Sequence, residues 1–135
     1  MGMDLALFRI TSRTREVWRM DQVFQLRRIY EDFSQLDAPL FQGIQGCCQE
    51  TKIQSAAVPA NVDLQFEGEA AQYFEHDGPV VLSRLTDPYG ERPHYMLAQD
   101  LKNLTWHPMT NQPIIDKVLA ATADNPDAVL LIWWH

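Results

Sequence analysis

Glycine and cysteine are scarce in this chain, which has six glycines and two cysteines among its 135 residues. The sequence contains no Walker loop, no dinucleotide-binding glycine fingerprint and no nucleophile elbow. Cys47 and Cys48 are adjacent, and a bond between neighbours would strain the backbone, so we expect two reduced thiols. These scarcities exclude the common nucleotide-binding classes and any disulfide framework.

Apolar runs of membrane-spanning length are also missing. No segment reaches the length of a membrane span. The first residues hold too short an apolar stretch for a secretory signal, and Asp4 interrupts it. We therefore expect a cytoplasmic protein without membrane contact. No histidine or cysteine pair has metal-ligand spacing, so the sequence predicts neither a metal site nor a cofactor.

Charge is unevenly distributed along a chain whose net charge is −7. Residues 1–28 carry a net charge of +3, and residues 29–135 carry −10. Such an acidic body repels nucleic acid and suits a basic partner. The candidate nucleic-acid contacts are the arginines of the first segment: Arg13, Arg15, Arg19, Arg27 and Arg28. Pairing of these arginines with the chain's own carboxylates is the simpler interpretation.

Periodicity predicts two long helices in one domain that spans residues 1–135. Apolar side chains recur at three- and four-residue spacing over 21–37 and again over 112–123. The outer face of the first helix would carry polar residues, among them Arg28, Glu31, Asp32 and Gln35. Shorter apolar segments predict strands at 4–11, 62–66, 80–85 and 95–97. The expected fold is α+β, a mixed four- to five-stranded sheet packed by the two long helices.

The strongest single signal is the apolar run from Ala128 to Trp134. It is rich in branched and aromatic residues, and Asn125-Pro126-Asp127 bounds it. This pattern predicts a strand that is buried on both faces of the sheet.

One loop stands out as a candidate binding surface. Trp106, His107 and Met109 follow one another around Pro108, between two predicted helices. Exposed tryptophan and methionine are favoured at protein interfaces, so we expect this loop to contact a partner. The alternative is that Trp106 closes the end of the core. A fully buried Trp106 would exclude its role as an interface anchor.

The first third of the chain resembles a group of small uncharacterised bacterial and phage proteins that open Met-Gly-Leu-Asp-Met-Tyr-Leu. The matching segments are Met1-Gly2-Met3-Asp4-Leu5, Val17-Trp18-Arg19, Ile29 to Phe33 and Gly46-Cys47-Cys48. The resemblance implies a bacterial or phage accessory protein and no catalytic residue.

These observations favour a non-enzymatic protein that binds another protein, with a basic partner suited to its acidic body. Self-association into a homo-oligomer stays open. One alternative is an enzyme that uses histidine and acidic residues near 94–107, where His94, Asp100 and His107 could also hold a metal. A second alternative is nucleic-acid contact through the arginine-rich segment. The sequence assigns no catalytic residue.

Overall fold

The computed structural model describes residues 4–36, 55–83 and 85–135. In these residues seven strands form one sheet in the order β3-β6-β7-β1-β2-β4-β5. Only β2 and β4 run parallel; the other neighbours are antiparallel. The strands are β1 (Leu5–Arg13), β2 (Val17–Gln25), β3 (Ala56–Ala57), β4 (Asp63–Phe66), β5 (Val80–Leu82), β6 (His94–Leu97) and β7 (Val129–Trp134). The helices are α1 (Tyr30–Phe33), α2 (Gly68–Tyr73), the 3₁₀ helix η2 (Ala98–Asn103) and α3 (Asn111–Ala121).

The α+β class is confirmed, but the finer prediction is wrong. The sheet has seven strands instead of four or five, and α3 is the only long helix among the described residues. The helix predicted over 112–123 corresponds to α3. The helix predicted over 21–37 is replaced by most of β2 and the four-residue α1. Cys47 and Cys48 lie outside the described residues, so their expected reduced state stays a prediction.

A β-bulge explains why β2 resembled a helix in the sequence. The pairing register shifts between Arg9 and Ile10, so Asp21 is an extra residue in β2. Same-face side chains are then three residues apart across the bulge instead of two. Met20 and Val23 contact one apolar cluster, and Phe24 contacts the cluster on the opposite face. Apolar residues at 20, 23 and 24 reproduce the spacing of a helix.

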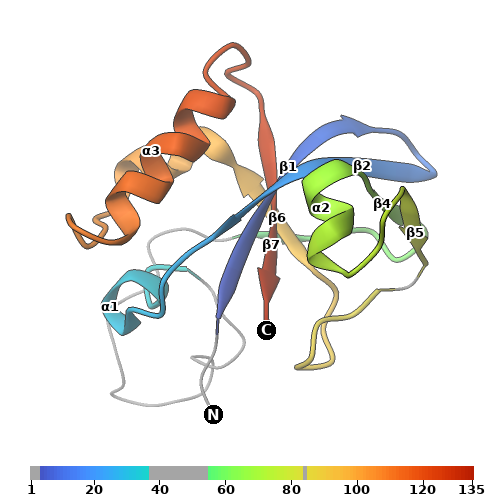
Figure 1. The fold of residues 1–135 in the computed structure, drawn as a ribbon, viewed down its shortest axis with the longest axis horizontal. Helices are drawn as coiled ribbons and strands as arrows, with labels where there is room; N and C mark the ends of the chain where they lie inside the picture. Colours follow the sequence, from blue (N-terminus) through green and yellow to red (C-terminus); the bar gives the residue numbers. More distant parts are fainter. Residues whose placement is uncertain (1–3, 37–54, 84) are drawn as a thin grey trace.

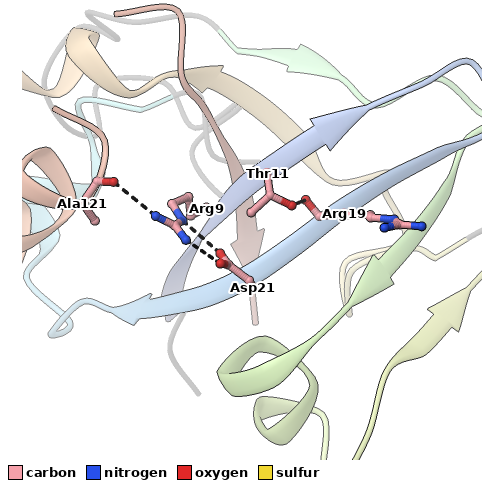
Figure 2. A network of polar contacts seen from close by, with 5 residues as sticks. All are labelled: Arg9, Thr11, Arg19, Asp21 and Ala121. Carbon is pink, nitrogen blue, oxygen red and sulfur yellow. Dashed lines mark hydrogen bonds and ion pairs between the residues drawn. The ribbon is translucent and has the colours of Figure 1, made fainter. Parts of the chain in front are cut away.

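The bulge is tied to α3 by a polar network (Figure 2). The Arg9 Nε donates to Asp21 Oδ1 at 2.9 Å, and Arg9 Nη1 donates to the Ala121 carbonyl at 3.3 Å. Ala121 is the last residue of α3, where the helix dipole favours a cation. A second register shift follows at Thr11, whose hydroxyl donates to the Arg19 carbonyl at 3.2 Å. Arg9 therefore ties the first bulge to the end of α3, and Thr11 joins the two strands of the hairpin at the second.

Strand β7 lies in the interior of the sheet, between β6 and β1, and all six of its residues are buried. This confirms the prediction of a strand buried on both faces. Leu130, Ile132 and Trp134 face the cluster covered by α1, η2 and α3. The alternate residues face the cluster covered by α2, which lies on the other side of the central strands (Figure 1).

The sheet curls around the second of these clusters. Trp18 of β2 and Tyr95 of β6 are separated by two strands in the sheet, yet their rings meet at 4.9 Å. Arg92 helps to hold the curl, because its guanidinium donates to the carbonyls of Leu85, Pro59 and Val62 at 2.8–3.1 Å. It thereby joins the segment after β3 to the segment after β5, and these strands form the two edges of the sheet. No helix in the described part of the chain has the length and apolarity needed to cross a membrane.

Candidate binding groove between α1 and the 105–110 loop

A groove of about 370 Å³ lies between α1 and the loop over residues 105–110. We call it the α1 groove. Its apolar lining comes from Ile29, Trp106 and Pro108, and its acidic lining comes from Glu31 and Asp32. The groove therefore places the predicted binding loop beside the two carboxylates of α1.

Buried polar side chains hold the loop in place. The Asp32 carboxylate, 4% exposed, accepts hydrogen bonds from the His107 backbone N–H at 3.1–3.2 Å and from Asn111 Nδ2 at 2.8 Å. Asn111 is fully buried and also binds both backbone groups of Arg27, at 2.7 and 3.0 Å. No arginine or lysine of the described residues lies within ion-pair distance of Asp32. The donors to this carboxylate are all neutral.

Gln35 fastens the start of the loop. Its side chain is 1% exposed, donates to the Thr105 carbonyl at 2.7 Å and accepts from the Thr105 N–H at 2.8 Å. This reciprocal pair imitates the hydrogen bonding of neighbouring strands. Together with Asp32, it removes most of the backbone freedom of residues 105–107 before any partner binds.

The three predicted binding residues have different environments. Trp106 is 3% exposed, packs in the apolar cluster under α3 and donates from Nε1 to the Leu101 carbonyl at 3.3 Å. The expectation that its side chain is an exposed interface anchor is therefore wrong, because the tryptophan closes the core. His107 is exposed, and Met109 is 84% exposed, the largest value among the large apolar residues of the described chain. Met109 is thus the large apolar side chain that this loop exposes to solvent.

The His107 ring is oriented by its own loop. Its Nδ1 lies 2.7 Å from the Thr110 hydroxyl and 3.3 Å from the Met109 backbone nitrogen. A backbone N–H can only donate, so Nδ1 is the acceptor and the neutral ring carries its proton on Nε2. The contact shapes the turn that presents Met109.

The five candidate nucleic-acid residues are not brought together. Arg13, Arg15 and Arg19 lie at or beside the turn of the β1–β2 hairpin, whereas Arg27 and Arg28 follow the opposite end of β2. The strand between them spans roughly 25 Å. Several of these arginines have partners within the chain. Arg13 stacks on the rings of Trp18 and Tyr95, Arg19 lies 3.9 Å from Glu67, and Arg28 pairs with Asp4 at 2.7 Å.

The residues of the enzymatic alternative also remain apart. His94 on β6 lies 2.7 Å from the Ser55 hydroxyl, whereas His107 contacts Thr110 on its own loop. No group of three histidine, cysteine, aspartate or glutamate side chains in the described ranges could hold a metal ion. His94, Asp100 and His107 therefore do not form a common ligand set.

Sequence reasoning missed the residues that build the groove. Asp32 and Gln35 were expected on the outer face of a long helix, but both are buried. Asn111 is the first residue of α3, and its side chain binds Arg27 and Asp32. Their partners lie 70–84 residues away in sequence, so no local pattern could identify them.

Comparison with known proteins gives no match for this chain among family models, curated proteins or solved structures.

Proposed function

We propose that this protein is a non-enzymatic binding protein that contacts a basic segment of another protein through Met109 and the α1 groove. The observation that carries the proposal is the exposure of Met109 on a loop whose backbone is fixed by buried hydrogen bonds. Methionine is enriched at interfaces, and its flexible thioether fits irregular apolar surfaces. A fixed loop lowers the entropy that association costs.

Charge supports a basic partner. Glu31 and Asp32 line the groove, and residues 29–135 carry a net charge of −10. A lysine or arginine of the partner could lay its aliphatic stem on Ile29 and Pro108 with its cation toward these carboxylates. A second copy of the chain would bring the same acidic surface, so charge favours a different protein over a homo-oligomer. The resemblance to bacterial and phage proteins suggests where the partner should be sought.

The experiment is site-specific photo-crosslinking in cells that produce the protein. A benzophenone amino acid replaces Met109 in one variant and Val81 in a matched control. Val81 is also an exposed apolar residue, 51% exposed, but it lies on the edge strand β5. We expect one adduct from position 109 that is absent from position 81 and is weakened by Glu31→Gln.

The adduct's partner should carry lysine or arginine at the crosslinked segment. Equal adducts from positions 109 and 81 would contradict a specific surface. A partner with an acidic crosslinked segment would contradict the charge argument. An adduct with a second copy of this chain would replace the proposal with self-association.

A further inference from the structure

A second cavity, distinct from the α1 groove, has the composition of an anion site. It has a volume of about 690 Å³ and lies where β1 begins and where β2 and β7 end. Its charged and polar lining comes from Asp4, Gln25, Arg27, Arg28 and His135. Leu5, Leu26 and Ile114 supply aliphatic lining. Its volume is in the range of small-molecule sites, roughly 300–1,000 Å³.

The groups around this cavity are held by the fold. Asn111 fixes the backbone of Arg27 through both its N–H and its carbonyl. Arg28 forms two hydrogen bonds to Asp4, at 3.1 and 2.7 Å. The His135 ring lies 2.7 Å from the Tyr73 hydroxyl through Nε2. A ligand would therefore meet groups that are already positioned.

The charges of the lining favour one negative charge on the ligand. The Asp4 carboxylate neutralises Arg28, whereas Arg27 has no carboxylate within ion-pair distance in the described part of the chain. Burial lowers the pKa of His135 from its ordinary value, which favours the neutral ring at pH 7. Arg27 is thus the cation of the lining that is left for an anionic ligand, and Asp4 would repel a dianion.

We propose that this cavity binds an organic monocarboxylate, with the carboxylate on the Arg27 guanidinium and a short apolar chain toward Ile114. A planar guanidinium can bind both oxygens of a carboxylate at once. Ile114 is half-buried on the first turns of α3, so it can contact an apolar chain without any change in the core. The ligand class is set by these two residues together.

The test is an NMR titration of the isotope-labelled protein with hexanoate. We expect saturable shifts of the Ile114 methyl groups and the Arg27 amide, with a Kd of about 1 mM, a reasonable affinity for eight heavy atoms. Arg27→Gln should weaken hexanoate at least tenfold. The matched control Arg15→Gln, at the exposed hairpin turn, should leave the Kd unchanged.

Three further ligands make the assignment falsifiable. Acetate should bind more weakly than hexanoate because it lacks the apolar chain, and hexanol should bind more weakly because it lacks the charge. Inorganic phosphate that binds as tightly as hexanoate would overturn the monocarboxylate class. Absence of saturable shifts with hexanoate, or equal binding by the Arg27→Gln variant, would overturn the site. Unchanged spectra elsewhere in Arg27→Gln establish that the variant is folded.

Discussion

Replacing Trp106 with alanine separates the packing role of the 105–110 loop from its binding role. The indole is 3% exposed and donates to the Leu101 carbonyl. Truncation removes its buried apolar surface and leaves a cavity, which for tryptophan costs about 3–5 kcal/mol of unfolding free energy. The loss is a large fraction of the 5–15 kcal/mol typical of a whole domain. We expect the melting temperature to fall by about 10–20 °C.

The assay is urea and thermal unfolding followed by far-ultraviolet circular dichroism. The chain has four tryptophans, so fluorescence would mix the signal of the mutated site with signals from elsewhere. Trp106→Phe keeps most of the apolar surface and loses only the indole N–H, so its loss of stability should be less than half as large. A Trp106→Ala variant that melts within about 3 °C of the native protein would refute the core position of this side chain.

Three other predictions concern stability. Burial lowers the pKa of His135 below its ordinary 6.5, so as the pH falls the unfolded chain binds a proton before the folded chain does. The contribution of His135 to the free energy of unfolding should therefore be constant above pH 6.5 and decrease below it. Urea unfolding between pH 5 and 8 should show this slope, and His135→Asn should remove it. Gly68 has a φ of +52°, which is strained for other residues, so Gly68→Ala should lower the free energy of unfolding by about 1 kcal/mol. Gly78→Ala, where an added Cβ meets no atom within 4 Å, should leave it nearly unchanged. Equal melting temperatures for the two variants would contradict backbone strain at Gly68. Arg92→Gln should lower the free energy of unfolding, measured in urea, by about 2 kcal/mol or more, because three carbonyls lose a charged donor. A smaller loss would show that Arg92 does not hold the curl of the sheet.

The strands with a clear local pattern could be predicted from the sequence. The run from Val129 to Trp134 is apolar at every position, and this pattern is typical of a strand that is covered on both faces of its sheet. Strand β1 up to Thr11 and the whole of β4 also matched their predicted positions. Strand β2 could not be identified, because the extra residue Asp21 changed its apolar spacing to that of a helix.

The pairing of strands depends on contacts between distant residues, and a sequence pattern does not encode them. The predicted strands at 80–85 and 95–97 follow one another in sequence, but they do not pair: β6 pairs with β7 and β3, and β5 pairs with β4. The same limitation applies to the candidate site. The sequence singled out this loop but could not show that Trp106 points into the core and Met109 into solvent, because Asp32 and Gln35 hold the loop from another element.

The most direct test of the binding proposal is a calorimetric titration of the crosslinked partner, purified separately, with three forms of the protein. Native protein and Val81→Ala should bind with the same Kd. Met109→Ala should bind about 30-fold more weakly, corresponding to about 2 kcal/mol for an interface anchor, with an unchanged melting temperature. A Kd that is the same for Met109→Ala and the native protein would contradict the proposal that Met109 and the α1 groove form the binding surface.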